Sequence, residues 1–268
     1  MVNKFFNVNA DITGMAQLPG NMMALCDWTS LKLVDLETGQ VTSSVQLSSW
    51  PHDVCAVPDN QAAVTLPLEG KIQLVDTRAG ILITTKIPIR MCCKGICFFQ
   101  DTFVVSYYGY AQCKVEIVDM TGKVLKEIEK DEAGQTLFSL PLYVAVDEVN
   151  GSVFVANASR NSITMINAEF KVIKTIVNKS LQQPRSMVLV DNKHLLVCCE
   201  GSNNLVLLNT EKQACRVLLD SDQDIFMPTC ATYNSGLGKL FVACRAKKSN
   251  EGCLVKVFSV EPRADDVK

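Results

Sequence analysis

Three basic side chains hold the same place relative to an apolar run, and their chemistry is that of anion recognition. They are the second residues of three related five-residue motifs: His52 in Pro51–Cys55, Lys94 in Cys93–Cys97 and Arg185 in Pro184–Val188. Cationic side chains at such positions can contact carboxylates or phosphates. Three arginines fall in neighbouring predicted loops: Arg90, Arg160 and Arg245. We interpret these six as candidate ligand-binding residues; the alternative is an ordinary polar loop surface.

A cluster of tyrosines adds aromatic surface to these charges. Tyr107, Tyr108 and Tyr110 lie close together in a segment predicted to be a long loop between two strands. Exposed aromatic side chains beside arginines are typical of the residues that dominate protein–protein interfaces. We therefore add the three tyrosines to the candidate ligand-binding residues, with Tyr108 as the strongest of them.

Residues suited to catalysis or metal binding are poorly represented. The chain has two histidines, His52 and His194, and no glycine-rich phosphate-binding loop. Cys93 and Cys97 lack the second cysteine pair and the histidine that would complete a zinc site. The sequence therefore predicts no catalytic residue, no metal ion and no cofactor.

A repeat positions these candidate residues. An apolar strand ending in a small polar residue returns six times at intervals of about forty to fifty residues. The copies are Leu33-Val34-Asp35, Leu74-Val75-Asp76, Ile117-Val118-Asp119, Met165-Ile166-Asn167, Leu207-Leu208-Asn209 and Val257-Phe258-Ser259. Such a period with four short strands per unit is typical of a β-propeller blade. The pattern predicts an all-β, six-bladed β-propeller of four-stranded antiparallel blades that fills residues 1–268 as a single domain.

The predicted blades leave one strand missing at the end of the chain and one in surplus at its start. The blades are expected at approximately 11–47, 51–88, 93–130, 140–177, 184–220 and 227–260. Pro262 and a charged tail leave no room for a fourth strand in the sixth blade, whereas residues 3–8 form a strand-like segment before the first. We expect this N-terminal strand to close the last blade, because an open ring would expose an apolar edge.

Five of the predicted inner strands begin with related short motifs. The clearest copy of the whole repeat begins at Pro184 and reads PRSMVLVDNKHLLVCCEGSNNLVLLN. This segment resembles the NHL repeat. The whole set resembles the six-bladed NHL or NHL-like C-terminal propeller of tripartite-motif (RING, B-box, coiled-coil) proteins. The family's acid at the end of the second strand is matched by Asp27 and, loosely, by Asn157 and Glu200, and it is absent from the second, third and sixth units. The resemblance implies the substrate-recognition domain of a tripartite-motif ubiquitin ligase.

Composition excludes several classes of protein. The formal net charge of −2 gives no general attraction to nucleic acid or to anionic membranes. No stretch is long and apolar enough to span a membrane, and residues 1–14 lack the apolar run of a signal peptide. Most of the twelve cysteines fall in apolar strand segments, where they act as small hydrophobes. We expect a cytoplasmic location with reduced thiols.

The predicted propeller gathers all the candidate residues on one face, formed by the loops between second and third strands and the loops between blades. Acidic residues on these loops interrupt the basic ones, whereas binding to an RNA backbone favours a continuous positive surface. We therefore predict a non-catalytic module, monomeric by itself, that docks a protein ligand on this face. Two alternatives stay open. An RNA-binding propeller predicts one merged positive surface, and a lactonase-type channel enzyme predicts carboxylates converging on a metal ion.

Overall fold

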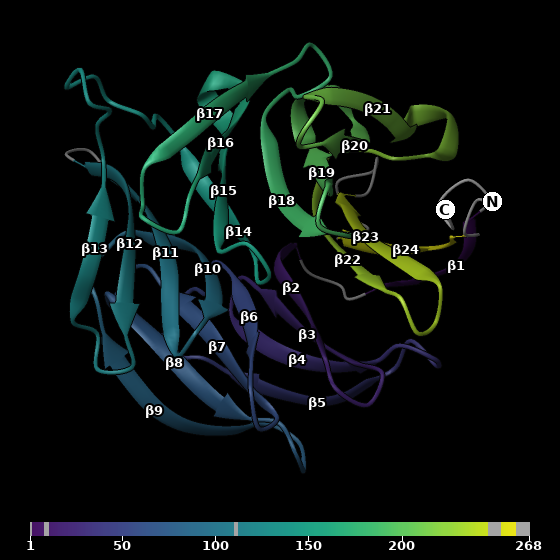
Figure 1. The fold of residues 1–268 in the computed structure, drawn as a ribbon. Helices are drawn as coiled ribbons and strands as arrows, with labels where there is room; N and C mark the ends of the chain where they lie inside the picture. Colours follow the sequence, from purple (N-terminus) through teal and green to yellow (C-terminus); the bar gives the residue numbers. More distant parts are fainter. Residues whose placement is uncertain (1, 8–10, 110–111, 246–252, 261–268) are drawn as a thin grey trace.

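Six antiparallel sheets of four strands each are arranged in a ring (Figure 1). The computed structural model describes residues 2–7, 11–109, 112–245 and 253–260. The innermost strands of neighbouring sheets contact one another in turn, and the sixth contacts the first. The predicted all-β, six-bladed β-propeller of antiparallel blades is confirmed.

Within each blade the strands follow the chain from the channel outwards. The first blade contains β2 (Ile12–Leu18), β3 (Met22–Asp27), β4 (Ser30–Asp35) and β5 (Val41–Gln46). The second contains β6 (Val54–Val57), β7 (Gln61–Leu66), β8 (Lys71–Asp76) and β9 (Leu82–Pro88). The third contains β10 (Cys93–Phe99), β11 (Thr102–Gly109), β12 (Gln112–Asp119) and β13 (Val124–Ile128).

The remaining blades repeat this arrangement. The fourth contains β14 (Pro141–Asp147), β15 (Ser152–Asn157), β16 (Ser162–Ile166) and β17 (Val172–Val177). The fifth contains β18 (Pro184–Leu189), β19 (His194–Cys199), β20 (Asn204–Asn209) and β21 (Ala214–Leu219). The sixth contains β22 (Pro228–Asn234), β23 (Lys239–Arg245), β24 (Cys253–Ser259) and, as its outermost strand, β1 (Val2–Asn7).

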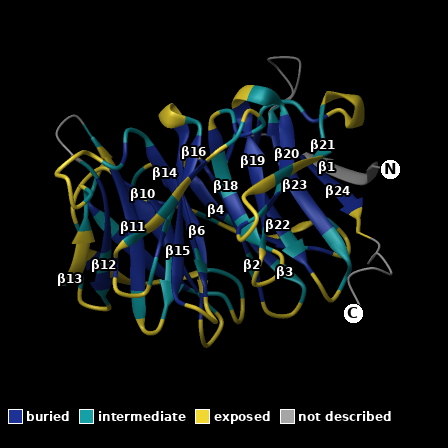
Figure 2. Cartoon of the chain, turned by 45° about the horizontal axis from the view of Figure 1, so that its top comes forward, coloured by how far each residue is buried: buried dark blue, intermediate teal, exposed yellow. Residues whose placement is uncertain are grey.

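The core lies between the blades. The second strands are buried because neighbouring blades cover both of their faces, and every residue of β15 is buried. The outermost strands face solvent: most of β9 is exposed, and so is most of β13 (Figure 2). One apolar cluster runs continuously through the first, fourth, fifth and sixth blades. No blade could therefore bury its apolar residues alone.

The two ends of the chain meet in the sixth blade. Strand β1 pairs antiparallel with β24, with Phe5 opposite Lys256 and Asn7 opposite Leu254. This pairing agrees with the expectation that an N-terminal strand closes the ring. Val8, the last residue of the predicted segment, lies outside the described residues.

Helical structure in the described part of the chain consists of short turns. The three 3-10 turns are η1 (Ala158–Arg160), η2 (Glu200–Ser202) and η3 (Ser221–Gln223). Among these residues, no helix has the length and apolar character needed to cross a membrane.

All twelve cysteines are free thiols. Cys26, Cys198 and Cys230 are fully buried on inner or second strands, and burial raises the pKa of each thiol. These side chains therefore pack as small hydrophobes, which agrees with the sequence interpretation.

The first prediction concerns ring closure. Deleting residues 1–9 removes the partner of β24 and exposes that strand's edge, so we expect a lower melting temperature and self-association. Thermal unfolding and size-exclusion chromatography of the truncated and full chains test this. A truncated chain that is monomeric and melts like the full chain would contradict it.

The second prediction concerns the thiols. Because no cysteine is paired, the melting temperature should be the same with and without a reductant. Losing a native disulfide typically costs about 2–5 kcal/mol, which a melting curve would detect. A marked drop on reduction would show that disulfides contribute to the fold.

Candidate binding face at the mouth of the channel

The loops between second and third strands and the loops between blades form one face of the ring, called here the loop face. Five inner strands enter the channel from it through a shift in strand register. The residues at or beside this entry are Thr13, His52, Lys94, Leu142, Arg185 and Thr229. Burial and the charges of Lys94 and Arg185 lower the pKa of His52 to about 3. The structure thus brings the three predicted basic residues together.

Tyr143 crosses the channel at this level. It comes from β14 of the fourth blade, and its hydroxyl donates to the Thr13 carbonyl of the first blade at 2.6 Å. The Cys230 thiol donates to the same carbonyl at 3.2 Å. The ring of His52 lies 5.3 Å from the ring of Tyr143. Side chains of three blades and a backbone carbonyl of a fourth therefore meet at the channel mouth.

A buried carboxyl group, Asp53, stands at the next position of the second blade. Its oxygens accept the backbone N–H groups of Val54 at 2.9 Å and Ile96 at 3.1 Å. Burial raises the pKa of Asp53 to about 8, although these two hydrogen bonds oppose the shift. Asp53 borders a cavity of about 310 Å³ that inner strands of all six blades line. The sequence showed this acid but gave no sign of its central place.

Two of the predicted arginines are held by one buried acid. Arg185 is ion-paired with Glu200, with Nε donating to Oε2 at 2.6 Å, and Arg245 lies 3.6 Å from Oε1 of the same carboxylate. Glu200 is only 6% exposed. Arg185 is therefore engaged by an internal charge, and Arg245 shares the same single carboxylate at a longer distance.

A second buried acid holds Arg90. The acid is Glu116, which is fully buried. The Nε atom of Arg90 lies 2.8 Å from Oε1 of Glu116, and Nζ of Lys114 lies 2.7 Å from the same oxygen. The expectation that Tyr107 lies in an exposed loop is wrong. Tyr107 belongs to β11 and is buried, because its side chain packs into an apolar cluster between the second and third blades.

The other predicted residues have different surroundings. Arg160 is exposed on η1 and donates from its guanidinium to the Leu137 carbonyl at 3.0 Å. Tyr108 is 42% exposed at the end of β11, so it stays a candidate, although it lies in a strand and not in a long loop. Tyr110 lies outside the described residues.

Lys94 differs from these cations. Its side chain is half-buried and forms no ion pair or hydrogen bond with the part of the chain that the structure describes. Burial is the main cause that lowers the pKa of Lys94, and Arg185 adds to it. Lys94 is therefore a cation without a protein counter-charge at the channel mouth.

Exposed apolar side chains gather on the loop face of the first three blades. The large ones are Trp28, Trp50, Leu68, Met91 and Tyr108, called here the apolar strip. The two indole rings meet edge to face at 5.5 Å. Backbone hydrogen bonds join the adjoining loops, since Cys92 N–H donates to Pro67 at 2.9 Å and Tyr108 N–H to Cys92 at 3.0 Å. The residues selected from the sequence did not include Trp28, Trp50, Leu68 and Met91, although large apolar residues in polar turns were a visible signal.

Polar side chains at the end of the second strand hydrogen-bond to the backbone of the loops. Asp27 accepts the backbone N–H groups of Thr29 and Ser30, each at 2.8 Å. Asn157 accepts those of Ser139 and Leu140 at 3.0 and 3.1 Å. Together with Glu200, these side chains fix the loop face and take no part in a free ligand site.

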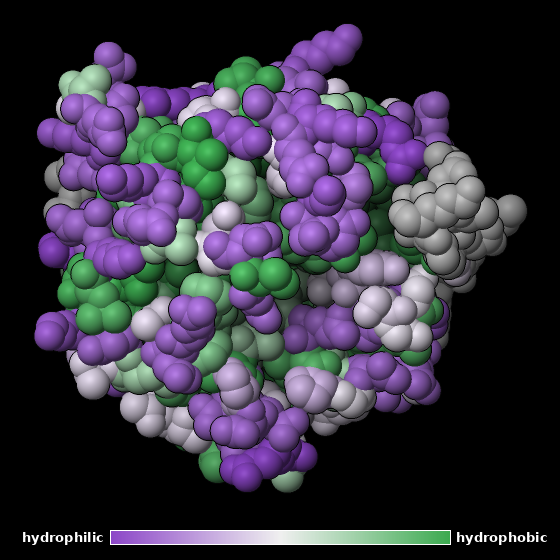
Figure 3. All heavy atoms as spheres, viewed as in Figure 1, coloured by the Kyte–Doolittle hydropathy of each residue, from purple (hydrophilic) through white to green (hydrophobic). Residues whose placement is uncertain are grey.

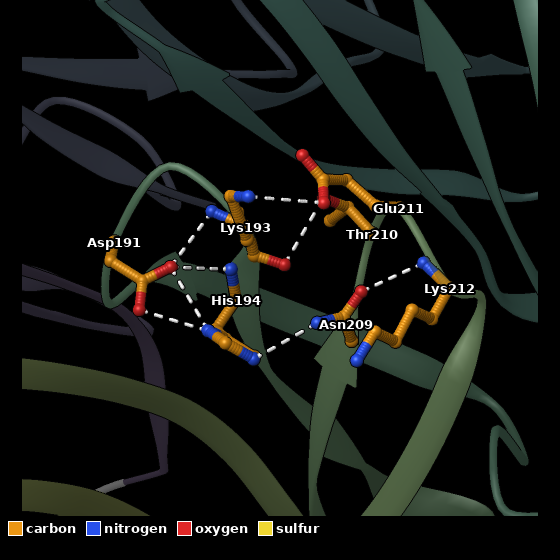
Figure 4. A network of polar contacts seen from close by, with 7 residues as sticks. All are labelled: Asp191, Lys193, His194, Asn209, Thr210, Glu211 and Lys212. Atoms are coloured by element: carbon orange, nitrogen blue, oxygen red, sulfur yellow. Dashed lines mark hydrogen bonds and ion pairs between the residues drawn. The ribbon is translucent and has the colours of Figure 1, made fainter. Parts of the chain in front are cut away.

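The second histidine lies on the opposite face, at the turns of the fifth blade (Figure 4). His194 Nδ1 contacts Asp191 at 2.9 Å, and its Nε2 contacts the Asn209 amide at 3.1 Å. An imidazole that donates from Nδ1 and accepts at Nε2 satisfies both contacts. Among the described residues, no three or more His, Cys, Asp or Glu side chains come together as metal ligands could.

Known structures share this fold. The β-propeller domain of Cps50 (Swd1) from Myceliophteria thermophila has a TM-score of 0.66 at 13% identity, over 93% of this chain and 83% of that chain. Virginiamycin B lyase from Staphylococcus aureus has a TM-score of 0.66 at 12% identity, over 97% and 89%. A streptogramin B lyase has a TM-score of 0.66 at 11% identity, over 95% and 96%. At these identities the likeness shows the fold alone. The chain matches no protein-family model and no curated protein.

The third prediction uses the buried acid of the channel. The pKa of Asp53, about 8 in the folded chain, lies far above the value near 4 expected in the unfolded chain. Between these values the folded state keeps a proton that the unfolded state releases, so stability falls as pH rises toward 8. His52 acts in the opposite direction, but only below its unfolded pKa of about 6.5.

Between pH 6.5 and 8, Asp53 is thus the only one of the two that changes stability. We expect the melting temperature of the native chain to fall across this interval, and that of Asp53→Asn to stay level because the amide does not titrate. Melting curves at constant ionic strength test this. Parallel declines in the two proteins would contradict the raised pKa.

Proposed function

We propose that this chain is a non-catalytic recognition module that docks a protein partner on its loop face. The apolar strip carries this proposal. It places two tryptophans, a leucine, a methionine and a tyrosine on one side of the channel mouth. Exposed aromatic and methionine side chains are enriched at the centres of protein interfaces.

The charges of the same face support a protein partner over RNA. The buried acids Glu116 and Glu200 engage Arg90, Arg185 and Arg245, so part of the positive charge of this face is already balanced inside the protein. Binding to a nucleic-acid backbone requires cations that are free to neutralise phosphates. Figure 3 shows the opposite face of the ring, where hydrophilic and hydrophobic side chains are mixed.

We base the biological context of this module on its resemblance to tripartite-motif proteins. We propose that it selects substrates for a ubiquitin ligase of that type and acts in the cytoplasm. The proposal rests on the repeat motifs of the sequence, such as the segment from Pro184 to Asn209, and on the match between the predicted and the observed blades.

The fourth prediction tests the proposed function by capture of partners from cell lysate, with and without nuclease. A protein partner should remain bound after nuclease treatment and should show modest salt dependence. Tyr108→Ala should weaken its binding by more than about 1 kcal/mol, because the side chain lies in the apolar strip. The dissociation constant of the purified partner measures this.

Val149→Ala is the matched control. Val149 is 83% exposed in the turn between β14 and β15, on the opposite face, so its truncation should leave binding unchanged. Capture that disappears with nuclease, with affinity falling steeply as salt rises, would instead indicate RNA. A partner that is insensitive to Tyr108→Ala but sensitive to Val149→Ala would move the site to the other face.

A further inference from the structure

One end of the apolar strip closes around a pocket of about 270 Å³. Its outer wall consists of Trp28, Trp50, Pro51, Pro67 and Leu68, and its channel side of Thr13, His52 and Lys94. We call it the tryptophan pocket. It lies between the first and second blades, and Lys94 reaches it from the third.

The outer wall is suited to an apolar side chain. Trp28, Trp50 and Leu68 are 47%, 57% and 61% exposed. Covering this apolar surface with an apolar group of a ligand would be favourable, because it removes the surface from water. Pockets that enclose whole small ligands have volumes of about 300–1,000 Å³. The tryptophan pocket is smaller, which fits one bulky side chain of a longer ligand better than a free small molecule.

The channel side is cationic and incompletely satisfied. Lys94 has no counter-charge among the described residues, and the buried Nδ1 of His52 has no hydrogen-bond partner there. The nearby acid Glu69 is already engaged by Lys71 at 3.2 Å and Lys86 at 3.6 Å. A half-buried cation without a partner favours a ligand that brings a carboxylate.

We propose that the tryptophan pocket binds an extended acidic segment of a protein partner, with a bulky apolar side chain against Trp28, Trp50 and Leu68 and an adjacent Asp or Glu carboxylate on Lys94. The charge of the pocket decides against a basic segment, and its apolar wall decides against a purely acidic one. This inference deepens the proposed function and rests on it.

Selection from a phage-displayed random peptide library on the full chain tests this recognition. Selected peptides should carry an aromatic or large aliphatic residue within two positions of Asp or Glu. A synthetic peptide of the selected sequence should bind Trp50→Ala about tenfold more weakly, and Trp50→Phe almost as well as the native chain. Val149→Ala should bind normally.

The carboxylate contact has its own test. Lys94→Gln should bind the acidic peptide about as weakly as the native chain binds a peptide with Gln in place of the acid. Lys94→Glu should prefer a peptide with Lys at that position, a reversal that unfolding cannot produce. Near-ultraviolet circular dichroism confirms that each variant is folded.

Selected peptides without an acid, peptides that bind Trp50→Ala equally well, or an absence of selected peptides would each overturn the inference. These outcomes are separable from failure of the proposed function. A protein partner that is captured on the loop face and weakened by Tyr108→Ala, but unaffected by Trp50→Ala and Lys94→Gln, refutes the pocket and leaves the proposed function standing.

Discussion

Closure of the ring is the constraint on which the rest of the structure depends. Each blade leaves the apolar faces of its middle strands to its neighbours, and an unpaired edge in this ring would expose them. Closure comes from backbone pairing between β1 and β24, which belong to opposite ends of the chain. Closure also fixes the distances across the channel, so it places every residue of the loop face.

Close packing of the inner strands follows from this constraint. A Cβ atom on Gly14 would lie 2.8 Å from the Cα of Asp53, and one on Gly95 would lie 2.6 Å from the Cα of Tyr143. Real Cβ atoms do not approach backbone atoms so closely, hence glycine is required at both positions. The space that these glycines leave lets Tyr143 reach the opposite blade and keeps Asp53 out of bulk water.

The loop face divides into two parts with different physical character. On the fifth and sixth blades, buried Glu200 engages Arg185 and Arg245, so charge there stabilises the interior. On the first three blades, apolar side chains remain exposed around Lys94, whose charge is unpaired within the described residues. Asp27 in the first blade accepts a hydrogen bond from the Thr29 backbone, and Asn157 in the fourth blade accepts one from the Ser139 backbone, so a partner would meet preorganised loops.

The fold could be predicted from the sequence, because the repeat length and the strand pattern of a propeller are visible in the local sequence of each unit. Copies such as Leu33-Val34-Asp35 mark the third strands, and the missing last strand with the surplus first one indicated how the ring closes. Repeat position also predicted that His52, Lys94 and Arg185 meet at one channel mouth. Equivalent positions in equivalent blades must converge on one axis.

The sequence does not show which of these residues have a counter-charge or are buried; the folded structure does. Arg185 and Lys94 look alike in the repeat, but Glu200 reaches the first from the end of another strand, whereas no described acid reaches the second. Tyr107 and Tyr108 are adjacent, yet Tyr107 packs into the apolar cluster between the second and third blades, whereas Tyr108 lies near the end of β11 and is exposed. Counter-charges and burial come from contacts between side chains on different strands, within one blade for Arg185 and Glu200 and between blades for Arg245 and Glu200. A repeat pattern carries no information about contacts that differ from blade to blade.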